Sequence, residues 1–271
     1  MKICINPVNF MSENPIKRIE LSKKAGFDSI EILGFEKELT QEGLREVKNA
    51  LKKHEMKATT IGGGPPLALS GGKLLIESDE HAVRERTLNY LKNCVDWAKE
   101  LEASIIYVCP LRKVGEINDQ KIALDNARNL FDKCAEYAEG SGVKFAIEHV
   151  PGSLISTSSS LNDVINDFNI DSLGTLLDIG HVNMSKEDPK ESVIQTDKLF
   201  HIHLDNNDGK NDIHTPFDVG TLTKQDFTSF IKASKEKGYD DYYSIEMLNL
   251  QDPMKTLRES INFLRTTYDG I

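Results

Sequence analysis

The stretch Phe145-Ala146-Ile147-Glu148 is a short apolar run that ends in a carboxylate, and three more runs of this kind follow it along the chain. They are Thr175-Leu176-Leu177-Asp178, Phe200-His201-Ile202-His203 and Tyr243-Ser244-Ile245-Glu246. Such short apolar runs are typical of buried parallel strands. Barrel enzymes keep their chemistry in the loops at the carboxyl ends of such strands. The four runs therefore predict a parallel barrel with its functional side chains at one face.

The four terminal residues, Glu148, Asp178, His203 and Glu246, together form a complete ligand shell for one divalent cation. One carboxylate alone could be an ordinary strand-end residue that turns toward water. Four successive strand ends without an aliphatic residue among them favour a shared metal site. Because three of the four ligands are carboxylates, the sequence indicates one Mn or Mg ion, with Co or Zn as alternatives given the imidazole.

An alternation of strand and helix patterns repeats eight times along the chain and predicts a single (β/α)8 TIM barrel over residues 1–271. A doubly wound open sheet is the alternative. The expected strands are 3–6, 29–33, 58–61, 104–109, 144–149, 174–178, 199–204 and 242–246. The expected helices are 15–25, 41–54, 81–101, 119–139, 159–168, 189–196, 224–237 and 253–266. No linker or low-complexity segment marks a second domain.

Composition describes a globular protein that carries net negative charge. The 271 residues include 33 Lys and Arg against 43 Asp and Glu, a formal charge of -10, which disfavours binding to a phosphate backbone. No window reaches about 18 uninterrupted apolar residues, so no membrane span is expected. The four cysteines form no C-x-x-C pair, which argues against a disulfide framework and a zinc knuckle. We therefore expect a cytoplasmic protein without nucleic acid or membrane partners.

Several polar residues follow the expected ligands closely in sequence. In Asp178-Ile179-Gly180-His181 the offset of three residues places the imidazole beside the carboxylate if the backbone turns helically there. His201 and His203 alternate with apolar residues, so both should point into the barrel. His203 lies nearer the mouth and is the expected ligand. His201 lies one layer deeper and is expected to be a hydrogen-bonded core histidine or a group that supports the ligands.

At these residues the chain resembles the xylose isomerase-like metal-dependent barrels, which include sugar isomerases, ketose 3-epimerases, inosose dehydratases and apurinic endonucleases. The most specific stretches are Asp178-x-x-His181, His203-Leu204-Asp205-Asn206 and Asp212-x-His214. The resemblance implies that Glu148, Asp178, His203 and Glu246 bind the catalytic metal and that His181 faces the substrate. Three further residues are expected to contact substrate: Asp212, His214 and Glu31. A second metal ion at His181, Asp212 and His214 is the alternative.

A site of this kind predicts an isomerase or epimerase. The metal would chelate the carbonyl and hydroxyl oxygens of a ketose, a polyol-derived ketone or a sugar phosphate and stabilise an enediolate, while Glu148 and Glu246 act as base and conjugate acid. A dehydratase of the inosose or dehydroshikimate type would start from the same enediolate, with His181 or His214 as the acid. A barrel that binds a sugar or a partner without catalysis is a further alternative.

The chain departs from relatives of the resembled families at several loops. The multi-zinc endonucleases use histidines after the third and fourth strands, but the loops at 61–66 and 108–110 contain none, so a phosphodiesterase is disfavoured. The substrate arginine of 3-epimerases is replaced by Gly209. Arg112, Lys113 and Lys210 could meet a phosphate, but exposed cations are more often solvated. The segment 62–64 is expected to be a flexible glycine turn, and a homo-oligomer remains open.

Overall fold

Eight parallel strands close into a barrel in the computed structural model, which describes residues 1–110 and 113–271. Each strand pairs with the next, and pairing of Lys2 with Tyr242 through Asn6 with Glu246 closes the barrel between the first and last strands. The strands are β1 (Lys2–Asn6), β2 (Ser29–Leu33), β3 (Lys57–Gly62), β4 (Ile105–Val108), β5 (Lys144–Glu148), β6 (Leu173–Asp178), β7 (Leu199–Leu204) and β8 (Tyr242–Glu246). The predicted TIM barrel is confirmed, and the open sheet is not formed.

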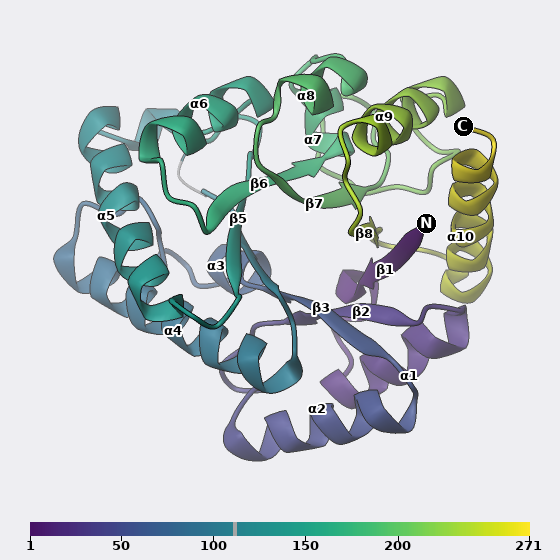
Figure 1. Cartoon of the computed structure of the whole chain (residues 1–271), viewed down its shortest axis with the longest axis horizontal. Helices are drawn as coiled ribbons and strands as arrows, with labels where there is room; N and C mark the ends of the chain where they lie inside the picture. Colours follow the sequence, from purple (N-terminus) through teal and green to yellow (C-terminus); the bar gives the residue numbers. More distant parts are fainter. Residues whose placement is uncertain (111–112) are drawn as a thin grey trace.

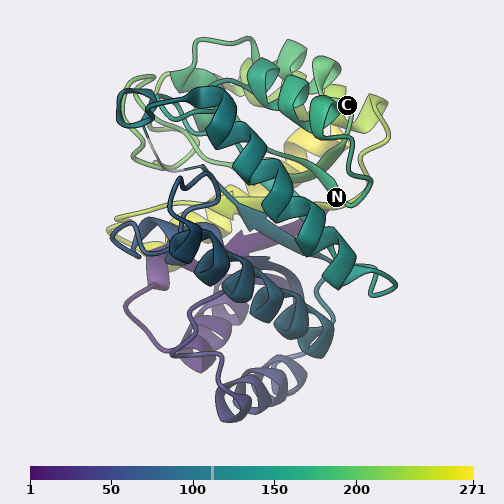
Figure 2. The ribbon, with the colours of Figure 1, turned by 90° about the vertical axis from the view of Figure 1, so that its left-hand side faces the viewer.

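Helices surround the barrel on its outside (Figure 1). The long ones follow the strands in turn, and α4 and α5 lie side by side on one flank (Figure 2). The helices are α1 (Pro15–Ala25), α2 (Gln41–Lys53), α3 (Gly64–Ala68), α4 (His81–Leu101), α5 (Gln120–Ala138), α6 (Ser158–Phe168), α7 (Ile179–Met184), α8 (Pro189–Gln195), α9 (Lys224–Glu236) and α10 (Pro253–Asp269). Two short 3-10 helices are η1 (Pro7–Phe10) and η2 (Val114–Glu116). No helix among the described residues is both long and apolar enough to cross a membrane.

Local sequence signals explain where the elements begin and end. The Asn14 side chain accepts a hydrogen bond from the backbone of Lys17, and Pro15 is the first residue of α1. The same helix ends at Gly26, whose φ of 111° is a left-handed conformation that favours glycine. The observed bounds lie within a few residues of those expected for the eight strands and the eight helices. The single-domain assignment over residues 1–271 stays a prediction.

The short helix α3 forms inside a segment that is predicted to be a loop. The helix α3 begins directly after β3, with Pro65 and Pro66 in its first turn. The glycines before it are buried, and a Cβ atom on Gly62 would lie 3.0 Å from the Tyr107 ring. The prediction of a flexible glycine turn at 62–64 is therefore wrong, because these glycines let an aromatic ring approach the backbone.

Polar side chains occupy much of the barrel interior. Alternate residues of a strand share a face, so Cys4 and Asn6 on β1, and likewise His201 and His203 on β7, point the same way. A small apolar cluster separates from the main core and contains Ile105, Tyr107, Ala146 and Leu176. The main core lies between the strands and the helices. The helix-facing layer therefore supplies most of the apolar burial, and the interior combines this small apolar cluster with polar groups.

We expect Gly174→Ala to destabilise the barrel, because the added Cβ atom would lie 2.6 Å from the Phe200 ring and 2.7 Å from the Lys198 carbonyl oxygen. Overpacking of this kind costs about 1–3 kcal/mol. Urea unfolding of the wild type and of Gly174→Ala measures the difference between their free energies of unfolding. Gly115→Ala is the matched control, because nothing lies within 4 Å of its Cβ position. Equal unfolding free energies for the two variants would contradict the prediction.

Candidate active site

Four predicted ligands converge at the carboxyl ends of β5, β6, β7 and β8. Glu148, Asp178, His203 and Glu246 each offer a ligand atom, and these atoms all lie within 4.8 Å of one another. His203 Nδ1 lies 2.6 Å from Glu246 Oε2, 3.7 Å from Glu148 Oε1 and 4.0 Å from Asp178 Oδ2. All four residues are buried. One imidazole nitrogen therefore faces three carboxylates in a space of the size that a single cation would fill.

Parallel pairing explains this convergence. Asp178 pairs with His203 in the register between β6 and β7, and Glu246 is the last residue of β8. Asp178 is also the N-cap of α7, where its Oδ1 accepts hydrogen bonds from the backbone of Gly180 at 2.6 Å and His181 at 3.1 Å. The helix thereby fixes one carboxylate oxygen and turns the other, Oδ2, toward the cluster.

The chemistry of the donor set fits a divalent cation. Asp178 Oδ2 is buried without a hydrogen-bond partner, which is costly unless another group binds it. Three clustered carboxylates repel one another in a medium of low dielectric constant. A divalent ion would relieve both costs, and Glu148, Asp178, His203 and Glu246 are the residues that would hold it.

Burial and neighbouring charge shift the protonation of these groups strongly. Burial alone would lower the pKa of His203, but Glu246, Glu31 and Glu148 outweigh it and raise that pKa well above its usual value. Burial raises the pKa of Glu148. Without a cation, the cluster therefore holds protons that a metal ion would have to displace.

Asn6 and Tyr107 support the cluster, and sequence reasoning missed both. The Asn6 side-chain amide donates to Glu246 Oε1 and to the Tyr107 hydroxyl, each at 2.9 Å. The edge of the Tyr107 ring meets His203 at a centroid distance of 5.0 Å. Asn6 is itself a polar residue at the end of a strand, which is the signal that identified the other four. Together these two residues fix one carboxylate and one face of the imidazole.

His181, Asp212 and His214 form a second group beside the first. His181 Nδ1 lies 3.3 Å from Glu148 Oε1, and its Nε2 lies 3.3 Å from Asp212 Oδ1. His214 Nε2 lies 3.0 Å from the same Asp212 oxygen. The Asp212 side chain is 45% exposed, whereas both histidines are buried. This group therefore lies between the metal ligands and solvent, where a substrate would enter.

Asp205 is a further buried carboxylate that the sequence analysis did not assign. Its Oδ2 lies 2.6 Å from His214 Nδ1. Burial and the nearby Asp178 raise its pKa well above the usual range. It follows His203 by two residues and so faces the same side of the chain, which is a signal that the spacing contains. Asp205 fixes the ring of His214.

Several other residues singled out in the sequence do not belong to the four-ligand cluster. Glu31 is fully buried beneath His203 and bonds to histidines, a position that favours support of His203 over contact with substrate. His201 is buried and hydrogen-bonded, in agreement with the core role expected for it. Lys113 and Lys210 are exposed, and Arg112 lies outside the described residues. A phosphate site at these cations stays a prediction.

Comparison with known proteins identifies the family. The family model described as xylose isomerase-like TIM barrel matches residues 19–267, so the chain belongs to this family. The chain is 25% identical to an inosose isomerase of Bacillus velezensis over 289 residues, covering 100% of this chain and 97% of that protein. It is 25% identical to a fructoselysine 3-epimerase of Shigella flexneri, with 90% of each chain covered.

Two further comparisons concern an uncharacterized protein and a solved structure. The chain is 30% identical over 183 residues to the uncharacterized protein MJ1311 of Methanocaldococcus jannaschii, and this match spans 64% of the chain and 61% of that protein. The crystal structure of the IOLI protein with a binding zinc atom superimposes with a TM-score of 0.79 at 22% identity, covering 98% of this chain and 96% of that one.

We expect the protein to bind one divalent ion firmly, with an affinity that weakens as pH falls. The ion requires neutral His203 and ionised carboxylates, whereas the pKa values of His203 and Glu148 are raised, so binding must release protons. Elemental analysis gives the ion count, and calorimetry in two buffers of different ionisation enthalpy gives the protons released. His203→Ala should lose the ion, and Glu42→Gln on the exposed face of α2 should keep it. A pH-independent affinity would contradict this prediction.

We expect His214→Ala to leave the metal count unchanged under zinc excess and to raise KM about tenfold, the effect of losing one hydrogen bond to a charged group. Ile213→Ala, an exposed neighbour in the same loop, should change neither quantity. Metal analysis and steady-state kinetics decide the outcome. Loss of one ion per chain in His214→Ala would instead indicate that His181, Asp212 and His214 hold a second metal.

Proposed function

We propose that the protein is a divalent-metal-dependent sugar isomerase or epimerase that acts on a ketose, a polyol-derived ketone or a sugar phosphate through an enediolate. One observation carries the proposal. Two glutamates at the barrel mouth, Glu148 and Glu246, share a cluster with Asp178 and His203 in which all ligand atoms lie within 4.8 Å. An acid-base pair and a complete cation shell thus occupy the same space.

The relatives support this class of reaction. Two relatives that match 100% and 90% of this chain carry names of sugar chemistry, an inosose isomerase and a fructoselysine 3-epimerase. The solved IOLI structure contains a zinc atom on the same fold, which supports a divalent metal here. Oxygen-rich ligands favour Mn or Mg, and Zn or Co suit the imidazole. We expect a small carbohydrate as substrate and the cytoplasm as compartment, with a monomer or a homo-oligomer both compatible with the fold.

A divalent ion bound at the four ligands would supply Lewis-acid chemistry that makes the hydrogen next to a substrate carbonyl more acidic. Glu148 or Glu246 then takes that proton, and the same or the other glutamate returns a proton, to the neighbouring carbon in an isomerisation or to the opposite face of the same carbon in an epimerisation. Asn6 holds Glu246 Oε1 through a hydrogen bond of 2.9 Å, which keeps the carboxylate oriented toward the cluster. The two glutamates thereby act as base and conjugate acid.

His181 is positioned to contact a substrate oxygen. Burial alone would lower its pKa, but Asp178, Asp212 and Glu148 outweigh it and raise the pKa to about 10. These carboxylates therefore favour the protonated, hydrogen-bond-donating form of the imidazole. Asp212 and His214 extend this polar surface toward solvent and are the residues that we expect to bind substrate hydroxyls.

The place of His181 beside Glu148, with its Nδ1 3.3 Å from Glu148 Oε1, also favours a second candidate, a dehydratase of the inosose or dehydroshikimate type. A dehydratase forms the same enediolate and then protonates a leaving hydroxyl group, a step for which a cationic imidazole is a suitable acid. A zinc-dependent endonuclease has less support, because the loops at 61–66 and 108–110 lack histidines and the net charge is -10. The alternatives differ in product and can be separated by experiment.

The test is a screen of Mn-loaded protein against ketoses, ketose phosphates and inososes in deuterated water. Proton NMR reports exchange of the hydrogen next to the carbonyl, and the product spectrum separates isomer, epimer and dehydrated product. The metal-free protein is the control. Absence of exchange and turnover across all three substrate classes, with metal loading verified, would overturn the proposal.

We expect Glu148→Gln and Glu246→Gln each to lower kcat by at least about 10²-fold, the usual contribution of a positioned general base, while some metal affinity survives. The amide keeps an oxygen donor but cannot accept the proton. Isothermal calorimetry measures the metal affinity of each variant, and steady-state kinetics with the substrate from the screen measures kcat.

The glutamates also predict the fate of substrate hydrogen. A substrate deuterated next to the carbonyl should lose its label to water during turnover by the wild type. Complete retention of deuterium in recovered substrate and product would indicate a hydride shift between carbons. The glutamates would then serve only as ligands.

A further inference from the structure

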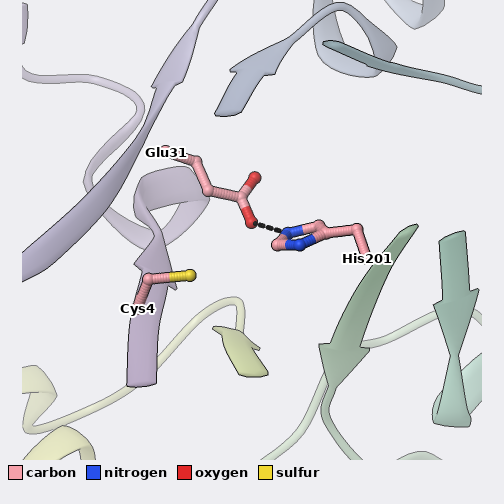
Figure 3. Close-up of side chains that lie close together, drawn as sticks. All are labelled: Cys4, Glu31 and His201. Atoms are coloured by element: carbon pink, nitrogen blue, oxygen red, sulfur yellow. Dashed lines mark hydrogen bonds and ion pairs between the residues drawn. The ribbon is translucent and has the colours of Figure 1, made fainter. Parts of the chain in front are cut away.

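A second set of buried polar residues lies one layer below the metal cluster. It contains Cys4 from β1, Glu31 from β2 and His201 from β7, which point toward one another inside the barrel (Figure 3). The exposed fractions of these residues are 0%, 0% and 1%. A buried carboxylate costs free energy unless hydrogen-bond donors or a cation compensate its charge. The layer therefore requires a physical explanation.

Glu31 connects this layer to the metal cluster. Its Oε1 lies 2.8 Å from His201 Nε2 and 3.2 Å from His203 Nε2. The two imidazoles come from alternate positions of β7, and their rings meet edge to face at 5.2 Å. Glu31 comes from β2, and β8 and β1 separate its strand from β7 around the barrel. One carboxylate oxygen thus reaches across the interior and accepts from both histidines.

This contact fixes which nitrogen of His203 can bind a metal. A neutral imidazole carries its hydrogen on one nitrogen and presents a lone pair on the other. Glu31 accepts a hydrogen bond only from a nitrogen that carries hydrogen, so with a metal bound Nε2 would keep its hydrogen and Nδ1 would be the ligand. Nδ1 faces the other ligands: it lies 2.6 Å from Glu246 Oε2, and a metal ion would replace the hydrogen between these two atoms. Without the carboxylate, the ring could rotate or change tautomer.

His201 holds Glu31 in place. Its Nε2 donates the second hydrogen bond to Glu31 Oε1, so the carboxylate oxygen that meets His203 is fixed from both sides.

We propose that Glu31, held by His201, is a positioning residue that orients His203 so that Nδ1 faces the metal. The inference rests on the proposed function, because it concerns the same metal site. It assigns a role to two residues that contact neither substrate nor metal. Mutation of a residue that supports a metal ligand in this way changes metal affinity about 10–100-fold.

The alternative is a second metal ion bound by Cys4, Glu31 and His201, whose ligand atoms lie within 4.8 Å of one another. One observation disfavours it. Glu31 Oε1 already accepts from two histidines. Cys4→Ser distinguishes the two hypotheses.

The experiment uses four variants of the full chain. Glu31→Leu removes the acceptor at similar size, Glu31→Gln keeps an acceptor oxygen without the charge, and His201→Gln removes the residue that holds Glu31. Cys4→Ser changes the same buried layer without touching His203 and is the matched control. Zinc affinity is measured by competition with a chelator, and elemental analysis gives the ion count.

A second measurement determines which nitrogen of the His203 ring binds the ion. Proteins labelled with 15N in histidine and loaded with zinc show by NMR whether Nδ1 or Nε2 of His203 binds the ion. We expect the wild type and Cys4→Ser to bind through Nδ1 with equal affinity. We expect zinc affinity to fall about 10–100-fold in Glu31→Leu, with mixed or reversed nitrogen signals, and Glu31→Gln to recover part of the loss.

The outcomes separate the inference from the proposed function. Wild-type protein that binds neither zinc nor manganese would overturn the metal site and the function with it. Wild-type affinity and unchanged Nδ1 signals in folded Glu31→Leu and Glu31→Gln would overturn the positioning role alone. If Glu31→Leu does not fold, Glu31→Gln and His201→Gln decide by the same two readouts. A lower ion count in Cys4→Ser would establish the second metal site and overturn the inference.

Discussion

The imidazole of His203 lies among four buried carboxylates, and this crowding of negative charge is the constraint on which the rest of the site depends. Glu31 meets one ring nitrogen at 3.2 Å, and Glu246 meets the other at 2.6 Å. Buried anions are stable only when donors or cations compensate them. Hydrogen-bond donors of the barrel compensate part of this negative charge. A cation in the space among Glu148, Asp178 and Glu246 would compensate the rest.

The backbone determines how each carboxylate points. Asp178 is fixed by the first turn of α7, so one of its oxygens is used by the helix and the other faces the cluster. Asn6 bonds Glu246 from the neighbouring strand. Buried glycines at and after the end of β3 bring the backbone close to the Tyr107 ring, which packs against His203. Residues far apart in sequence thus hold one site rigidly, which is the preorganisation that metal and acid-base chemistry require.

The same geometry explains why the reaction class is easier to assign than the substrate. The cluster of ligands and glutamates belongs to the barrel strands, whose positions follow from the fold. The groups that would read a particular sugar, Asp212 and His214, belong to the loop after β7, and Asp212 is 45% exposed. Residue 209 of this loop is a glycine, where the resemblance to 3-epimerases would place a substrate-binding arginine. Loops of this kind vary while the strands remain, so specificity is decided there.

The sequence by itself determined the barrel, its eight strands and the four residues at the ends of β5 to β8. It could do so because strand alternation and helix caps are local, and because parallel strands bring their carboxyl ends to one face. The tertiary structure alone decided that Glu31 lies beneath His203, that Asn6 holds Glu246 and that Asp205 holds His214. Glu31 and His203 are 172 residues apart, and Asn6 and Glu246 are 240 apart. No periodicity within one strand reports which side chain lies across a barrel, because barrel closure and stagger set that contact.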